Sequence, residues 1–263
     1  MLWLYSIDSW LLCLIGVGLT LALGLIGMLL TRRWVHAHWS RSKDVVGFYL
    51  SATGVIYAVL LATIAVAAWQ NYTQLELGVS QEANLVGNVY HDLEGYPEPA
   101  RSQMRQALLE YTVAVISRDW PQMRNNLPVD GSTGAADKLI GAWARFKPAN
   151  SAEVILHTET FSVLNHILGL RRQRIQSADI SLLPVLWVVV LLGGFINIAL
   201  TWLVTTDDVR LNILLTGGYC VSVGLMIFLI VALDHPFWGD VSVGPGAFEF
   251  VRSTMERPPR VAF

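Results

Sequence analysis

The sequence predicts an all-α membrane protein with four transmembrane helices in two pairs and a helical extension between the second and third helices. Four apolar runs carry no charged side chain, and each is long enough to cross a hydrocarbon core of about 30 Å. The runs are residues 11–30, 46–69, 182–204 and 213–233. Charged residues make up 14% of the 263-residue chain, against about 25% in soluble domains.

This pattern divides the chain into four parts. They are a transmembrane helix pair in residues 1–70, a helical extramembrane segment in residues 71–181 that is continuous with the helices on either side, a second transmembrane pair in residues 182–233, and a tail in residues 234–263. Most tryptophans lie near the ends of the apolar runs, where amphipathic rings favour the headgroup region. We therefore expect a multi-pass protein of the lipid bilayer, without a cleavable signal peptide.

The extramembrane segment begins with the apolar spacing of a helix. From Tyr72 to Leu93, apolar residues return every three or four positions. Because this stripe starts directly after Trp69, we expect the second transmembrane helix to continue out of the membrane. Glu82 lies on the stripe, so its carboxylate is either half-exposed or paired with an arginine, or else buried with a structural partner.

Further helices are expected along this segment. One begins near Pro99 and ends at Trp120–Pro121, and a turn-rich loop covers residues 125–134 before a short helix. A long helix runs from about Ser151 into the third transmembrane helix, with a kink where Pro184 enters the membrane. We find no alternating pattern bounded by tight turns, as a strand would show.

Basic residues near the membrane predict the orientation of the chain. The loop after the first apolar run contains four of them, whereas none precedes that run. They are Arg32, Arg33, Arg41 and Lys43. This distribution places the loop in the cytoplasm, with the N-terminus and the helical extension outside. Three arginines shortly before the third run favour the opposite orientation.

Small residues form stripes on the transmembrane helices. On the second helix, the stripe contains Gly47, Ser51, Gly54 and Ala58. Such stripes let helix backbones approach closely in lipid, so we expect helix packing there. The contact lies either within one chain or between the chains of a homo-oligomer.

The hydrocarbon core lacks ionisable side chains, which argues against proton-coupled transporters and voltage sensors. On the second helix, Thr53 and Tyr57 share one face and are followed by Leu60 and Ile64. Hydroxyl groups followed by aliphatic side chains are compatible with a pore that has a hydrophobic constriction. The alternative is that these hydroxyls form hydrogen bonds within or between helices.

Signals of other chemistry are weak. The short motifs of zinc hydrolases, dithiol sites, serine hydrolases and P-loops do not occur, so we expect neither catalytic residues nor a cofactor. The net charge of −2 gives no reason to expect nucleic-acid binding. Arg171, Arg172 and Arg174 are candidates for contacts with ions or lipid phosphates, and a solvated, interface-anchoring face is the alternative.

Several stretches of the chain, taken in order, resemble one family of membrane proteins. They are Gly47–Tyr49, Gly54–Leu61 with Trp69, Glu82–Ala83 with Val89–Tyr90, Tyr111 with Asp119–Pro121, Arg171–Ile175 before Leu183–Pro184, and Leu233–Asp240. The set covers nearly the whole chain and resembles the bacterial bestrophin-like membrane proteins. The resemblance implies a distant similarity to bestrophins, which are pentameric anion channels with four membrane helices and a helical extension.

The resemblance also raises the question of calcium. In bestrophins, the segment after the fourth helix starts with Pro-Phe-Gly and continues into an acidic run that binds calcium. Here Pro236–Asp240 looks similar at its start, but Val241–Gly244 follows in place of the acidic run. Calcium takes roughly six to eight oxygen ligands, so Asp234 and Asp240 are only weak metal candidates. Bestrophin topology would also place the extension in the cytoplasm, opposite to the orientation that the basic loop favours.

Two functions therefore stay open. The first is an oligomeric channel, for anions and with five subunits if the resemblance holds, whose second helix lines the pore. The second is a non-conducting membrane anchor with a structural or sensory role, whose extension binds a partner. A membrane enzyme ranks behind both because no catalytic constellation supports it.

Overall fold

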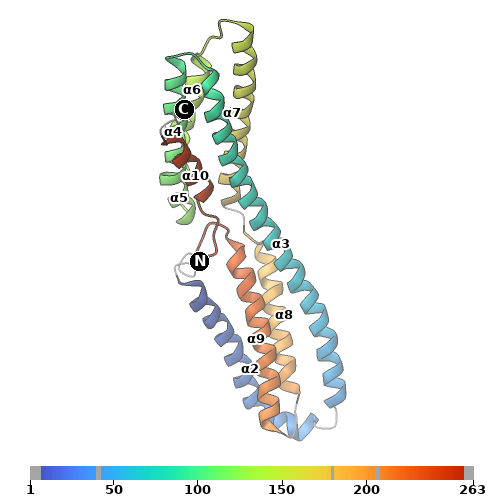
Figure 1. The fold of residues 1–263 in the computed structure, drawn as a ribbon. Coiled ribbons are helices and arrows are strands. Elements are labelled where there is room, and N and C mark those ends of the chain that lie inside the picture. Colours follow the sequence, from blue (N-terminus) through green and yellow to red (C-terminus); the bar gives the residue numbers. More distant parts are fainter. Residues whose placement is uncertain (1–6, 40–42, 179–180, 205–207, 258–263) are drawn as a thin grey trace, which may run out of the picture.

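The computed structural model describes residues 7–39, 43–178, 181–204 and 208–257, and these residues form helices and connections without a strand. The predicted fold class, an all-α membrane protein, is confirmed. The molecule is elongated, with a bundle of membrane helices at one end and the helical extension at the other (Figure 1).

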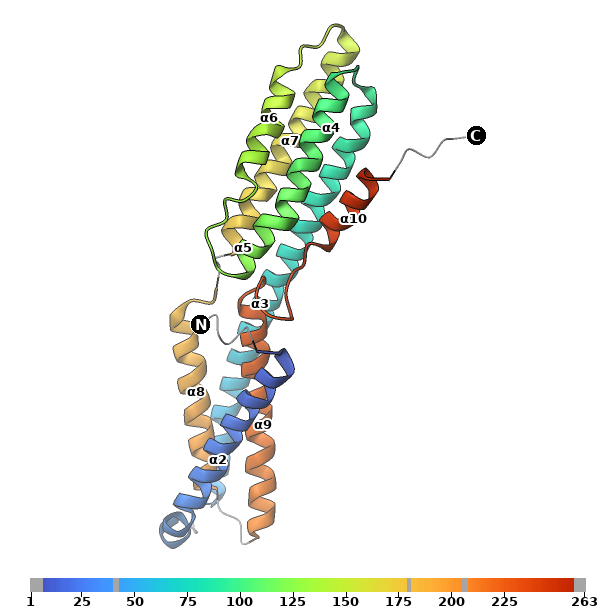
Figure 2. The ribbon, with the colours of Figure 1, turned by 90° about the vertical axis from the view of Figure 1, so that its left-hand side faces the viewer.

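Four of the described helices are long and apolar enough to cross a membrane, as predicted. They are α2 (Ser9–Trp39), α3 (Lys43–Asp92), α8 (Pro184–Leu203) and α9 (Val209–Asp234). Helices α8 and α9 lie beside the first half of α3, and α2 packs against α8 and α9 on the side away from α3 (Figures 1 and 2). Many large apolar side chains are exposed on these helices, far more than a soluble monomer would show, as expected of surfaces that meet lipid.

Glycines let the membrane helices approach closely. The main neighbour of α2 is α9. A Cβ atom at Gly24 would lie 2.2 Å from the Sγ of Cys220, and one at Gly224 would lie 2.9 Å from the Cα of Val17. These small residues of the first and fourth transmembrane helices therefore pack within one chain.

Helix α3 connects the two ends of the molecule. Its 50 residues run without interruption from the membrane bundle into the extension, as predicted for the second transmembrane helix. Helix α7 (Ser151–Ala178) lies beside the second half of α3. Two reciprocal hydrogen bonds cap the start of α7. The Asn150 side chain accepts one from the Glu153 N–H, and the Glu153 carboxylate accepts one from the Ala149 N–H.

Helices α7 and α8 are separate, in contrast to the single kinked helix that the sequence predicted. Helix α7 ends at Ala178, and α8 begins at Pro184, whose missing N–H costs nothing in a first helical turn. The carboxylate of Asp234, at the end of α9, accepts hydrogen bonds from the backbone N–H of Leu182 (2.6 Å) and the indole Nε1–H of Trp187 (3.2 Å). Asp234 therefore fixes the connection that leads into α8.

Short helices complete the extension. They are η2 (Leu93–Gly95), α4 (Ala100–Ala114), the π-helical turn η3 (Val115–Asp119), α5 (Trp120–Arg124) and α6 (Thr133–Arg145). Leu108, Tyr111 and Trp143 are fully buried in the core that these helices share with α3 and α7. The sequence predicted a helix end at Trp120–Pro121, but η3 leads directly into α5. Pro121 lies in the first turn of α5, where its missing N–H is tolerated.

The tail after α9 returns to the extension and forms α10 (Gly246–Met255), which the sequence analysis did not predict. Phe248 of α10 is fully buried, and the hydroxyl of Tyr90 donates a hydrogen bond to the last carbonyl of α10 at 3.1 Å. The indole N–H of Trp120 donates to the carbonyl of Val243 at 3.1 Å. The tail therefore connects the end of the membrane bundle to the extension.

Candidate functional site

Two of the four predicted pore-lining residues face the interior of the chain. Tyr57 is 5% exposed, and its hydroxyl donates a 2.9 Å hydrogen bond to the carbonyl of Val190 on α8. Ile64 is 7% exposed and belongs to the same apolar cluster. Cβ atoms at Gly193 and Gly194 would lie 2.9 Å and 2.7 Å from Tyr57, so these glycines provide the space for its ring. The Tyr57 hydroxyl therefore bonds a neighbouring helix, which is the alternative that the sequence left open.

The other two candidates, Thr53 and Leu60, are half-buried. The hydroxyl of Thr53 donates to the carbonyl of Tyr49 at 2.9 Å, and that of Thr63 donates to the carbonyl of Leu60 at 2.8 Å. Hydroxyl groups that bond a carbonyl of the preceding turn are satisfied without water. These threonines therefore need no contact with water or an ion.

The opposite side of α3 is exposed throughout the membrane bundle. Six exposed residues recur there every three or four positions and so share one stripe of the helix. We call this stripe the outward face of α3; it consists of Ser51, Val55, Ala58, Val59, Ala62 and Val66.

Side-chain size distinguishes the outward face from the exposed surfaces of the other membrane helices. The outward face carries no side chain larger than valine, whereas α2 exposes Leu30 and α8 exposes Phe195. The larger exposed side chains of α3, Phe48, Ile56 and Trp69, lie beyond or beside the stripe. Small side chains let another helix approach closely in lipid. The outward face therefore differs in composition from the exposed surfaces of α2 and α8.

The predicted small-residue stripe of this helix overlaps the outward face. Ser51 and Ala58 are exposed, and a Cβ atom at Gly47 would meet nothing within 4 Å. The nearest atoms to a Cβ at Gly54 would be 4.0 Å away. Unlike the glycines of α2 and α9, this stripe has no close neighbour among the described residues of the chain. The described part of the chain therefore does not pack closely against this stripe.

A buried ion pair joins α7 to α3 inside the extension. Arg174 and Glu82 are 2% and 0% exposed, and two hydrogen bonds join them, Nε–Oε2 at 2.8 Å and Nη2–Oε1 at 3.1 Å. The hydroxyl of Tyr111 donates to Glu82 Oε1 at 2.9 Å. Burial raises the pKa of Tyr111 well above its usual value, and the charge of Glu82 adds to the effect, so the phenol keeps its proton. Burial alone would lower the pKa of Arg174, but Glu82, with smaller contributions from Tyr111 and Asp119, outweighs burial, and the pKa is raised.

Asp119 brings a second carboxylate to this arrangement, which we call the extension cluster (Glu82, Tyr111, Asp119 and Arg174). Asp119 Oδ2 lies 3.3 Å from Arg174 Nη2, and its two oxygens accept the hydroxyl and the backbone N–H of Ser132 at 2.7 Å and 2.8 Å. The π-helical turn η3 ends at Asp119. Two buried carboxylates and one guanidinium give the cluster a formal charge of −1.

Part of this cluster could be anticipated from the sequence. Glu82 was expected to be half-exposed or paired with an arginine, or else buried with a structural partner, and the structure shows it both buried and paired with an arginine. Arg174 was not predicted as the partner, nor Asp119 as a member. The available signal was position: Arg174 lies two helical turns after the fully buried Ile167, on the buried stripe of α7.

The three arginines predicted to contact ions or lipid phosphates have different surroundings. Arg174 is buried and engaged by carboxylates, which leaves it no exposed edge for a lipid phosphate. Arg171 donates to the hydroxyls of Ser132 (2.7 Å) and Thr133 (3.0 Å), at the start of α6. Arg172 alone is exposed. The interpretation as an ion or lipid contact is therefore limited to Arg172 and the outer part of Arg171.

The two weak metal candidates bind N–H groups. Asp240 accepts a 2.9 Å hydrogen bond from the backbone N–H of Ser9 at the start of α2, and Asp234 binds Leu182 and Trp187 as described above. In the part of the chain that the structure describes, no three His, Cys, Asp or Glu side chains gather to hold a metal. Since calcium needs roughly six to eight oxygen ligands, these residues do not fit the calcium site that the resemblance implies. Asp240 joins the tail to the first membrane helix directly.

Comparison with known proteins agrees with this architecture and confirms the resemblance. A family model described as a Bestrophin-like domain matches residues 18–248. A variant of a bacterial bestrophin homolog from Klebsiella pneumoniae has a similar crystal structure, with a TM-score of 0.72 and 11% identity over 92% of this chain and 97% of that chain. The structure of this homolog solved by zinc phasing gives a TM-score of 0.68 and 10% identity, over 92% and 96% of the two chains. At such identities the likeness concerns the fold alone. No curated protein sequence matches the chain.

Proposed function

We propose, because this chain belongs to the bestrophin-like family, that it forms a homo-oligomeric channel for small inorganic ions in a bacterial plasma membrane. The observation that carries the proposal is the outward face of α3, a stripe of small side chains that no part of the described chain covers. Closed rings of identical subunits place the same surface of every copy around one axis. With the outward face turned toward that axis, α3 would surround a central path, and the family resemblance implies five copies.

The composition of the outward face suits a gated path. Val55 and Val59 are 65% and 60% exposed, and Val66 follows at 54%. In an oligomer, each would recur once per copy and form a hydrophobic ring. Such rings gate by dewetting, because a narrow apolar passage expels water until it widens. This proposal transfers the pore-lining role from Tyr57 and Ile64, which pack inside the chain, to the three valines.

The extension cluster holds the proposed pore helix in position outside the membrane bundle. Glu82 belongs to α3, which also carries the outward face, and Arg174 belongs to α7. The buried ion pair therefore fixes the proposed pore helix to the extension. A displacement of the extension would be transmitted to the outward face through α3 because that helix is continuous.

The charge of the conducted ion has two candidate assignments. The resemblance implies anions. One observation favours cations instead: between residues 45 and 90, Glu76 is the only exposed charged side chain of α3, because Glu82 is buried. Glu76 lies fourteen residues after Ala62, at the edge of the continued outward face, so it would recur once per copy beyond the valines. Rings of carboxylates attract cations.

The proposed orientation follows from the basic loop. The start of α2, the extension and the described tail lie toward one end of the membrane helices, whereas the end of α2, the start of α3, the end of α8 and the start of α9 lie at the other end (Figure 1). We place the α2–α3 connection in the cytoplasm because of its basic residues, of which the side chains of Arg33, Arg41 and Lys43 lie outside the described part. The extension would then lie outside the cytoplasm. Active cytoplasmic reporters fused after residues 130 and 255 would reverse this assignment.

Assembly and conduction test the proposal together. Purified protein should appear as a ring with a central axis in electron micrographs, and liposomes that contain it should pass ions down a gradient. The sign of the reversal potential in a potassium chloride gradient separates the two assignments, and Glu76→Gln should reduce a cation preference. A monomer, or no flux under gradients of several salts, would indicate the non-conducting anchor whose extension binds a partner.

A further inference from the structure

A cavity lies where the membrane bundle meets the extension, between α3 and α7. Its volume is about 310 Å³, roughly that of ten water molecules. Leu182 before α8, Leu233 at the end of α9 and Pro236 of the tail line one end of it. The cavity therefore lies near the level at which α3 passes from apolar to polar residues, after Trp69.

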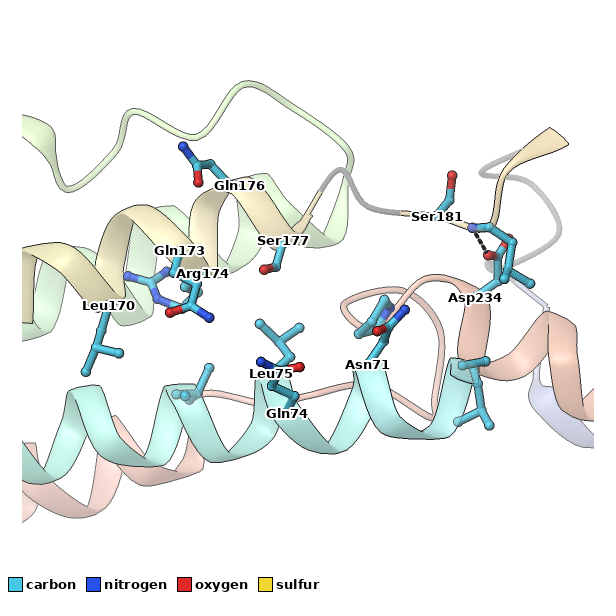
Figure 3. Close-up of a pocket in the computed structure, with 16 residues that line it drawn as sticks. Asn71, Gln74, Leu75, Leu170, Gln173, Arg174, Gln176, Ser177, Ser181 and Asp234 are labelled. Carbon is cyan, nitrogen blue, oxygen red and sulfur yellow. Dashed lines mark hydrogen bonds between the residues drawn. The ribbon is translucent and has the colours of Figure 1, made fainter. Parts of the chain in front are cut away.

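Unpaired polar side chains converge in this cavity (Figure 3). Gln173 and Ser177 point from α7 toward α3, and Asn71 and Gln74 rise from α3 on the facing side. Within the described part of the chain, none of these four side chains forms a hydrogen bond to a protein atom. Three carboxamides and one hydroxyl are thus available to a ligand, and all four can accept a hydrogen bond.

The charges around the cavity disfavour an anion. Among the described residues that line it, Arg174 alone is cationic, and its guanidinium is already paired with Glu82 and Asp119. The carboxylate of Asp234 lines the opposite end. Arg174 and Asp234, the two charged residues among the described lining, sum to zero, but Glu82 and Asp119 are bonded to Arg174 behind the wall and bring the formal charge of this region to −2. A positively charged ligand is therefore attracted.

The kind of cation follows from the chemistry of the walls. Quaternary ammonium groups carry no donor and are held by aromatic faces, but the described residues that line this cavity include no aromatic side chain. A primary ammonium has three donors and matches the carboxamide oxygens and the serine hydroxyl. Beside these groups, Leu75, Leu170 and Leu182 form an apolar wall that suits an alkyl chain.

We propose that this cavity binds the primary ammonium group of an amphipathic molecule, held by Asn71, Gln74, Gln173 and Ser177 with its apolar part against the leucines. Two sources share this chemistry, a soluble alkylamine and the headgroup of an ethanolamine lipid. Because the ligand contacts both α3 and α7, its binding fastens the extension to the proposed pore helix. The binding itself does not depend on whether the protein conducts ions.

Thermal unfolding of the purified full chain in detergent tests the proposal. n-Butylammonium chloride should raise the unfolding midpoint by about 2–4 °C at concentrations well above its Kd. Tetramethylammonium chloride and sodium butyrate, at equal ionic strength, should not. The same assay compares phosphatidylethanolamine, whose headgroup is a primary ammonium, with phosphatidylcholine, whose headgroup is quaternary, both with the same short acyl chains.

Two variants make the test specific. Gln74→Leu and Gln173→Leu each remove a converging carboxamide and should abolish the rise without lowering the midpoint of the free protein, since neither side chain bonds to protein. Gln81→Leu is the matched control, because Gln81 is exposed on the same helix as Gln74 and does not line the cavity, so the rise should persist.

The outcomes distinguish the two possible sources of the ammonium group from a failure of the proposal. A rise with phosphatidylethanolamine alone assigns the site to a lipid headgroup, one with butylammonium alone assigns it to a soluble amine, and a rise with both supports the shared ammonium chemistry. The proposal is overturned if neither probe raises the midpoint, if the quaternary analogues act equally, or if the rise survives in Gln74→Leu and Gln173→Leu.

Discussion

Arg174 of α7 and Glu82 of α3 form a bidentate ion pair between residues 92 positions apart in the chain, and neither side chain is exposed to more than 1%. All strong hydrogen bonds of these two side chains are formed within the extension cluster. A buried pair of this kind contributes little compared with an apolar contact of the same size, but breaking it is costly. The pair therefore makes the relative position of α3 and α7 unique.

Arg174→Leu is the first prediction. The substitution leaves Glu82 and Asp119 buried without a counter-charge, so we expect a loss of about 3–5 kcal/mol in the free energy of unfolding. Chemical unfolding in detergent micelles, followed by tryptophan fluorescence, measures this loss. Arg172→Leu is the matched control, because Arg172 is exposed on the same helix, and it should stay within about 0.5 kcal/mol of the parent. Equal losses in the two variants would contradict the role of the cluster.

Tyr57→Phe tests whether Tyr57 belongs to the packing of the chain. Removing the hydroxyl breaks the hydrogen bond to the Val190 carbonyl, and we expect a loss of about 0.5–1.5 kcal/mol. Ion flux through liposomes should not change, because the ring lies inside the chain. Tyr49→Phe, at an exposed position of the same helix, should alter neither quantity. A changed ion selectivity in Tyr57→Phe with unchanged stability would return Tyr57 to the pore.

Gly224→Leu should prevent the close approach of α9 and α2. Even its Cβ atom would lie 2.9 Å from the backbone of Val17, which cannot move without displacing α2. We expect a low yield of folded protein, measured by size exclusion in detergent. Gly218→Leu on the same helix provides the comparison, because nothing lies within 4 Å of a Cβ there, and it should give a normal profile. Similar profiles for the two variants would mean that α2 and α9 do not cross at Gly224.

The stability of the extension should depend on pH through His157. Burial lowers its pKa from the ordinary value of 6.5, so the folded chain takes up a proton less readily than the unfolded chain. The imidazole, which shares a hydrogen bond with the Tyr96 hydroxyl, therefore contributes stability that is fully present above pH 6.5 and is lost as the pH falls toward the lowered value. The unfolding midpoint should fall between pH 7.5 and pH 5.5, and the fall should be smaller in His157→Gln. An identical pH dependence in both proteins would exclude this contribution.

The fold could be predicted from the sequence because lipid and helix periodicity leave strong signals. Four uncharged runs and the continued stripe after Trp69 are sufficient for the four spans and for the extension of α3. The break between α7 and α8 was missed because Pro184 is compatible with both a kink and a helix start. Helix α10 was missed because ten residues carry too short a pattern, and because its docking depends on Trp120 and Tyr90 from distant segments.

The candidate site was harder to predict because a single helix does not reveal which of its faces turns inward. Tyr57 and Ser51 both lie among small and apolar residues in the sequence. Only the position of α8, with Gly193 and Gly194, shows that Tyr57 is internal. The partners of buried charges are equally hard to predict. The position of Glu82 on an apolar stripe indicates that it needs a counter-charge, but the sequence does not show which arginine supplies it.

The most direct test of the central claim, that the outward face of α3 lines an ion path, is cysteine modification during a flux measurement. Val59→Cys is introduced after Cys13 and Cys220 have been replaced by alanine, and a water-soluble charged methanethiosulfonate is added to liposomes that contain the protein. Val188→Cys, exposed to the same 60% on α8, is the control. We predict that the reagent blocks flux through Val59→Cys and leaves flux through Val188→Cys unchanged. Flux that is unaffected at Val59→Cys, in a protein that conducts, would show that this face meets lipid and would contradict the account.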